Sequence, residues 1–128
     1  MDFYLRRKMH LKVGKKKVEG VPVFELEGKI MGGRESLQLS EHLQSLIQHG
    51  EKNIILNFSD VQWINSSGIG LLLSCMRELR NKGGDLHFVG LHGRISEYFK
   101  ITKLDSVLKI YRNTDEAVGK LRAAEAGS

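Results

Sequence analysis

Short apolar runs alternate along this chain with segments whose apolar residues recur at helical spacing. Residues 53–58 form an almost continuous apolar run, which is typical of a strand covered on both faces of a sheet. Residues 35–49 carry leucine and isoleucine at i, i+4, i+7 and i+8 and stop before Gly50, which predicts an amphipathic helix with a glycine at its carboxyl end. A second helix is expected over residues 69–81, ended by two glycines. Strands that alternate with helices imply crossover connections and a mainly parallel sheet.

The chain opens with a predicted β-hairpin. Residues 11–18 and 21–27 mix apolar and polar positions on either side of a Glu19-Gly20 turn. Pro22 has no N–H for a ladder, so we expect it at a strand start or facing an unpaired edge. We therefore predict an α/β fold, with a mainly parallel sheet, an N-terminal β-hairpin and helices packed against the sheet. The later elements are expected as a strand over 85–90, a helix over 93–101, a strand over 107–111 and a helix over 115–124 that Thr114 caps.

The chain's 128 residues fit one domain, and no Gly/Ser-rich linker divides them. We expect a basic N-terminal arm at residues 1–8, a single domain at 9–122 and a flexible tail at 123–128. The strands and the helix over 69–81 should share one core. Its expected members are Ile54, Leu56, Phe58, Ile69, Leu72, Leu73, Leu86 and Val89.

Positive charge is concentrated at the amino end. Residues 1–20 carry seven basic and two acidic side chains, so they account for the whole net charge of +5. An anionic partner would meet this arm first. A solvated charged end is the favoured interpretation, with nucleic acid or anionic lipid as alternatives, and we predict no direct nucleic-acid binding.

The single cysteine, Cys75, excludes an intramolecular disulfide and fits a reducing, cytoplasmic setting. No Cys/His cluster suggests a metal, and we expect no cofactor. No apolar run approaches the roughly 20 residues that span a bilayer, and the first residues lack the apolar core of a signal peptide.

The loop Asn65-Ser66-Ser67-Gly68 is the most informative motif because it immediately precedes a predicted helix. Free backbone N–H groups and the positive end of the helix dipole should meet there, so a phosphate on a serine would be tolerated. The simpler interpretation is that Asn65 or Ser66 only caps the helix. Trp63 nearby is expected to pack a helix against the sheet or, alternatively, to lie at a protein interface.

Enzymatic interpretations have little support in the sequence. Gly68-Ile69-Gly70 begins a dinucleotide-binding pattern, but Leu73 occupies the position of the third glycine. The G-x-S-x-G motif of hydrolases is absent around Ser66. A set of His92, Ser66 and Asp60 can be imagined, but nothing in the spacing requires it.

The stretch from Ile54 to Gly70 resembles the STAS domain, in particular the small bacterial anti-sigma factor antagonists. Members of this family typically show an apolar strand, an aspartate and then D-S-S-G-[LI]-G, and this chain reads N-S-S-G-I-G at the corresponding place. The segments 26–30 and 83–86 also look like the family, and the resemblance covers residues 11–121. Asn65 stands where the family usually has aspartate, which keeps the shape of the cap and removes its charge.

The resemblance implies a binding switch without catalysis. In such proteins the unphosphorylated domain binds an anti-sigma factor, often a serine kinase with the histidine-kinase-like ATPase fold, and the sigma factor is released. The kinase phosphorylates the first serine of the pair, here Ser66, and a metal-dependent serine phosphatase reverses the modification. The residues expected to bind the partner are Trp63, Asn65, Ser66, Ser67, Gly68 and Ile69.

Two other functions stay open on the sequence. One is a STAS-like module without a phosphorylation switch, acting as a subunit of a lipid-transport or sensory complex. The other is a small enzyme that uses the Ser66 loop, for which the sequence offers no convincing base.

Overall fold

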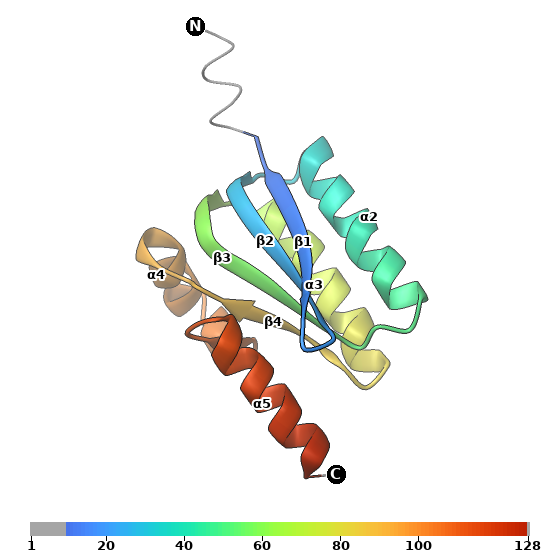
Figure 1. The fold of residues 1–128 in the computed structure, drawn as a ribbon. Coiled ribbons are helices and arrows are strands. Elements are labelled where there is room, and N and C mark those ends of the chain that lie inside the picture. Colours follow the sequence, from blue (N-terminus) through green and yellow to red (C-terminus); the bar gives the residue numbers. More distant parts are fainter. Residues whose placement is uncertain (1–9, 128) are drawn as a thin grey trace, which may run out of the picture.

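The computed structural model describes residues 10–127, which form one five-stranded sheet with helices on both faces (Figure 1). The strand order is β1-β2-β3-β4-β5; β1 and β2 are antiparallel, and every later pair is parallel. This topology confirms the predicted α/β class. The strands are β1 (Lys12–Val18), β2 (Val21–Ile30), β3 (Asn53–Ile64), β4 (Asp85–Val89) and β5 (Lys109–Tyr111); the helices are α2 (Arg34–Gln48), α3 (Ser66–Asn81), α4 (Gly93–Ile101), α5 (Thr114–Ala126) and a short 3₁₀ turn, Leu104–Ser106.

The opening hairpin forms as predicted. Val18 pairs with Val21, so the turn contains only Glu19 and Gly20, whose φ angles of 49° and 84° are both positive. A turn of this kind matches the right-handed twist of the two strands that it joins. Pro22 is the second residue of β2, and the parallel pairing of β2 with β3 begins one residue later, at Val23. The missing N–H of the proline therefore precedes that ladder.

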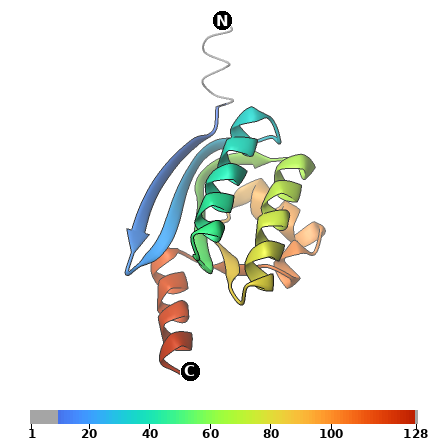
Figure 2. The same ribbon diagram turned by 90° about the vertical axis from the view of Figure 1, so that its right-hand side faces the viewer.

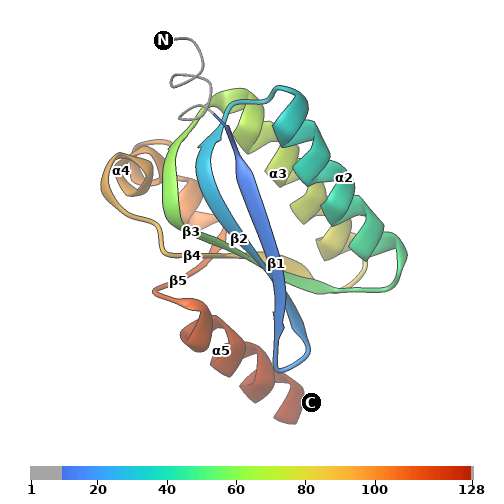
Figure 3. The ribbon, with the colours of Figure 1, turned by 45° about the horizontal axis from the view of Figure 1, so that its top comes forward.

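The sheet has helices on both faces (Figures 2 and 3), and it separates a large apolar cluster from a small one. Helices α2, α3 and α4 share the larger core with one face of the sheet, and Phe58, Phe88 and Phe99 meet there in edge-to-face and tilted contacts. Helix α5 packs on the other face against a smaller cluster around Val23, Ile55 and Val89. The sheet is thus covered on both sides along residues 53–58 of β3, as the apolar sequence of that segment predicted.

Six of the eight expected core residues share the larger core; Val89 is buried in the smaller cluster on the other face of the sheet instead, and Leu73 is only partly buried. Leu72, Met76 and Leu79 form the buried stripe of α3, whereas Leu73 is only partly buried and packs at its flank. Successive residues of a helix differ by about 100° in direction, so Leu72 and Leu73 cannot both face the centre of the core.

Two expected element boundaries were wrong near the middle of the chain. Strand β3 continues through residues 59–64, beyond the predicted run 53–58, because it keeps pairing with β2 across two register shifts as far as Ile30 and Ile64. Helix α3 begins at Ser66 instead of residue 69. The Ser66-Ser67-Gly68 segment is therefore the first turn of a helix.

The C-terminal elements also differ in their ends. Strand β5 begins at Lys109, because the 3₁₀ turn Leu104–Ser106 precedes it and leaves Val107 exposed. Asn113, not Thr114, caps α5: its Oδ1 accepts from the Glu116 N–H at 2.9 Å. Helix α5 runs to Ala126 and so includes residues that were expected to form a tail. The predicted basic arm at 1–8 lies outside the described residues.

Within residues 10–127, none of the helices is both long enough and apolar enough to cross a membrane.

Candidate functional site

Strands β2 and β3 end side by side, and each leads directly into a helix. The pair Ile30 and Ile64 closes the ladder between the two strands. The chain then turns through Gly33 into α2 and through Asn65 into α3. The amino ends of two helices are therefore brought to one edge of the sheet (Figure 1). We call this region, residues 31–33 and 63–67, the Ser66 edge.

Asn65 joins the two loops of the Ser66 edge. Its backbone N–H donates to the Ile30 carbonyl at 3.1 Å, and its side-chain Nδ2 donates to the Met31 carbonyl at 3.0 Å. Its Oδ1 accepts from the Gly68 N–H at 2.9 Å. One carboxamide thus caps α3 and holds the end of β2 at the same time. Of the two expected caps, Asn65 and Ser66, the structure selects Asn65.

Two glycines let the loops approach each other closely. A Cβ on Gly68 would lie 2.5 Å from the Ile30 carbonyl oxygen and 2.9 Å from the Ile30 Cγ2. A Cβ on Gly32, which has a φ of +80°, would collide with the Ser67 Cβ. Because no larger residue fits at either place, the first turn of α3 is seated directly on the end of β2. This packing fixes the position of the serine pair.

Ser66 and Ser67 are both exposed, and Ser66 is the first residue of α3. No hydrogen bond between described residues uses the Ser66 hydroxyl, and the first turn of α3 contains no acidic side chain. The cap occupies the Gly68 N–H, and the N–H groups of Ser66 and Ser67 donate no hydrogen bond to the described residues. A phosphate on Ser66 would meet these donors and the positive end of the helix dipole.

The six residues expected to bind a partner are not equally placed. Ser66, Ser67 and Trp63 are exposed, the last by 37%, and Asn65 is partly buried. Gly68 is buried against Ile30, and Ile69 is buried in the larger core, so neither presents a side chain to a partner. Trp63 is partly exposed and belongs to neither core cluster, so the structure does not support its packing a helix against the sheet; a role at a protein interface stays a prediction.

Met31 is a surface residue that the sequence analysis missed. Its side chain is 40% exposed, and its carbonyl accepts the hydrogen bond from Asn65. A shallow hollow of about 100 Å³ beside it is lined by residues that include Lys29 and Arg34. Together with Trp63, it gives the Ser66 edge two exposed large apolar side chains. The sequence did contain a signal for this exposure, because Met31 lies between a predicted strand and the glycines Gly32 and Gly33.

The histidines do not assemble a catalytic group. His87 lies inside β4, where its ring is hydrogen-bonded to Asn53 at 2.9 Å and to Tyr111 at 3.1 Å. No hydrogen bond within residues 10–127 joins Ser66, His92 and Asp60. The same residues contain no group of three potential metal ligands.

The family of the chain follows from a comparison of its sequence with known families. The sequence profile described as the STAS domain matches residues 12–117, so this chain belongs to the STAS domain family.

Several relatives are anti-sigma factor antagonists. The anti-sigma-B factor antagonist of Staphylococcus aureus is 28% identical over 78 residues, which are 61% of this chain and 72% of that protein. The fold is also that of Bacillus SpoIIAA, an anti-sigma factor antagonist. Its unphosphorylated form has 23% identity and a TM-score of 0.68 over 88% of this chain and 98% of that one. Its phosphorylated form has 21% identity and a TM-score of 0.66 over 88% and 99%.

Proposed function

We propose that this protein is an anti-sigma factor antagonist that binds its anti-sigma factor through the Ser66 edge and loses that binding when Ser66 is phosphorylated. The observation that carries the proposal is the position of Ser66. Ser66 is an exposed residue at the start of α3, no hydrogen bond between described residues uses its hydroxyl, and the Ser66 edge around it also carries the exposed residues Met31 and Trp63.

Phosphorylation at this position would change binding without unfolding the domain. A phosphate adds about −1.5 to −2 charges, which the N–H groups of Ser66 and Ser67 and the helix dipole can accommodate. The same charge would have to lose water when a partner covers the edge, and burying a charge without a partner is costly. The free protein therefore tolerates the phosphate, whereas an apolar or acidic partner surface rejects it.

The chemistry of the switch belongs to the partners. The Ser66 oxygen would attack the γ-phosphorus of ATP, which forms the phosphoester and releases ADP and a proton. In this proposal the kinase is the anti-sigma factor itself, with the histidine-kinase-like ATPase fold, and a metal-dependent serine phosphatase hydrolyses the ester. The protein contributes an accessible hydroxyl and acts in the cytoplasm, where ATP and sigma factors are found.

The proposal is tested by titrating the purified anti-sigma factor from the same genome with three forms of this protein. The forms are the unmodified chain, the chain with phosphoserine installed at position 66, and a matched control with phosphoserine at position 67. We expect at least a tenfold loss of affinity for the first modification and a smaller loss for the second. Ser66→Ala should bind as the unmodified chain does.

A second candidate is a STAS module without a phosphorylation switch. Asn65 favours it, because the family's usual carboxylate before the serine pair is replaced by an amide that is hydrogen-bonded to Met31. Equal affinities for all three forms would support this second candidate and reject the switch.

A further inference from the structure

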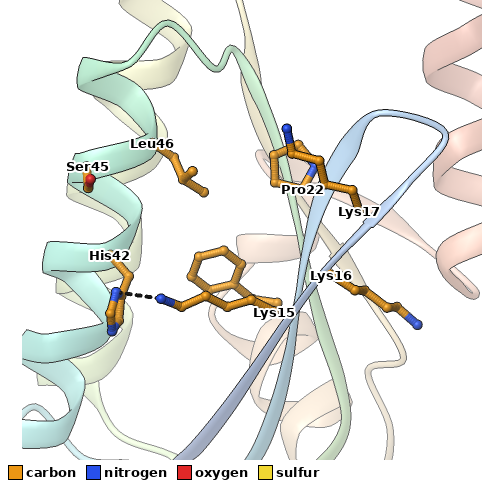
Figure 4. Close-up of a pocket in the computed structure, with 8 residues that line it drawn as sticks. Lys15, Lys16, Lys17, Pro22, His42, Ser45 and Leu46 are labelled. Atoms are coloured by element: carbon orange, nitrogen blue, oxygen red, sulfur yellow. Dashed lines mark hydrogen bonds between the residues drawn. The ribbon is translucent and has the colours of Figure 1, made fainter.

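A groove separates the hairpin from α2 on the side of the sheet that carries the larger core (Figure 4). It encloses about 350 Å³, which lies within the range of small-molecule sites. Its position on α2 is distinct from the Ser66 edge, which adjoins only the first turn of that helix. The groove is lined by Lys15, Lys16, Lys17, Pro22, Phe24, His42, Ser45 and Leu46.

The floor of the groove is apolar. Phe24 is 2% exposed and belongs to the main core, and Leu46 is a partly buried residue packed against that core. Pro22 of β2 pairs with Lys17 of β1, and the proline ring adds a third hydrocarbon surface to the floor. A hydrocarbon chain lying on these side chains would lose its contact with water at little cost in polar desolvation.

The three lysines at the rim of the groove differ in the direction of their side chains and in their carboxylate partners. Residues of a strand alternate between its faces, so Lys15 and Lys17 lie on the groove side of β1 and Lys16 on the other. Figure 4 shows the Lys16 ammonium directed away from the groove, and it is paired with Glu25 at 2.5 Å. The Lys17 ammonium lies 3.9 Å from a Glu51 carboxylate oxygen.

Lys15 has no carboxylate partner within residues 10–127. Its Nζ lies 2.9 Å from His42 Nδ1, across the mouth of the groove (Figure 4). An ammonium can only donate, so the imidazole nitrogen accepts, and the positive charge of Lys15 is not neutralised. The groove therefore combines an apolar floor with one uncompensated cation held in place by a neutral group.

We propose that this groove binds an amphipathic monoanion, a carboxylate attached to an unbranched hydrocarbon chain. The carboxylate binds the Lys15 ammonium in a charge-assisted hydrogen bond, and the hydrocarbon chain lies on Phe24, Leu46 and Pro22. The single uncompensated charge matches a monoanion, and the apolar floor distinguishes it from a small polar anion.

The test is a titration of the full-length protein with decanoate below its micelle concentration, followed by backbone amide shifts. Shifts should concentrate on residues 15–24 and 42–46. Lys15→Met keeps an unbranched apolar side chain and removes the charge, so it should weaken decanoate binding about tenfold. Lys12→Met is the matched control, because it removes an exposed charge of the same strand outside the groove lining, and it should leave the affinity unchanged.

Decanol tests the contribution of the charge. It has the same hydrocarbon length without the carboxylate, and it should bind at least tenfold more weakly than decanoate. The proposal is overturned if decanol binds as tightly as decanoate, if Lys15→Met and Lys12→Met have equal effects, or if the shifted amides lie outside the groove. Circular dichroism of both variants verifies that they are folded.

Discussion

Asn65 shows how much of the Ser66 edge depends on a single side chain. Its Oδ1 caps α3 and its Nδ2 holds the Met31 carbonyl. Aspartate in its place would keep the acceptor and add a favourable charge at the helix amino end, but it would lose the donor. Alanine would lose both.

We therefore predict that Asn65→Ala lowers the free energy of unfolding by about 1–2 kcal/mol and that Asn65→Asp costs less than half as much. Urea denaturation of the two variants measures both values. Equal losses would mean that the Met31 hydrogen bond matters more than the cap.

His87 is a buried group whose partners fix its protonation. Asn53 Oδ1 can only accept, so His87 Nε2 carries the proton and Nδ1 accepts from the Tyr111 hydroxyl. Burial lowers the pKa of His87 below its ordinary value of 6.5, although Asp85 opposes the shift. The folded protein therefore holds a neutral imidazole.

This shift makes stability depend on pH. His87 binds its proton at a higher pH in the unfolded chain than in the folded one. The free energy of unfolding should therefore keep its full value above pH 6.5 and decrease as the pH falls below 6.5. Urea denaturation at pH 7.5 and 5.5 measures the loss. His87→Gln lacks the titrating group and should show a smaller difference between the two pH values; an unchanged difference would assign the effect to other groups.

At the scale of elements, the contact of α3 with β2 is the critical one. Gly68 has no room for a side chain because of Ile30, whereas Gly70, also in α3, is exposed and has nothing within 4 Å of its virtual Cβ. Gly68→Ala should therefore destabilise the protein by about 1–3 kcal/mol through overpacking. Gly70→Ala should stabilise it by up to about 1 kcal/mol, since alanine is the better helix former.

Thermal or urea unfolding of Gly68→Ala and Gly70→Ala tests whether the two changes in stability have opposite signs. Stabilisation by both substitutions would show that the first turn of α3 is not seated on β2.

The same elements show what the sequence could predict and what it could not. The strand over 53–58 and the glycine after α2 followed from local patterns, and both were confirmed. The second half of β3 did not, because Ser59, Asp60 and Gln62 are polar and only the pairing with β2 makes that segment a strand. Asn113 and Thr114 are both good caps, so local chemistry could not choose between them.

The candidate site divides in the same way. Residue type and position named two candidate caps, Asn65 and Ser66, and the structure selects Asn65. Ile69 was expected both in the core and at the partner surface, and it lies in the core. The burial of Gly68 could not be predicted, because it depends on Ile30, which is distant in the sequence. The exposure of Met31 likewise depends on where β2 ends beside β3.

On the scale of the whole molecule, α2 borders two separate surfaces. Its first turn adjoins the Ser66 edge, and the Glu35 carboxylate in that turn accepts a hydrogen bond from the Leu11 N–H at 3.1 Å. Its later turns form one wall of the groove. The Leu11 contact joins the residue before β1 to the first turn of α2.

The central claim is that Ser66 is the switch, and phosphosite mapping tests it most directly. The full-length protein is incubated with its cognate anti-sigma kinase and ATP, and the phosphate is located by mass spectrometry. The account predicts modification of Ser66, absent in Ser66→Ala and retained in Ser67→Ala. Phosphate on Ser67 alone, or no phosphate while partner binding is intact, would contradict it.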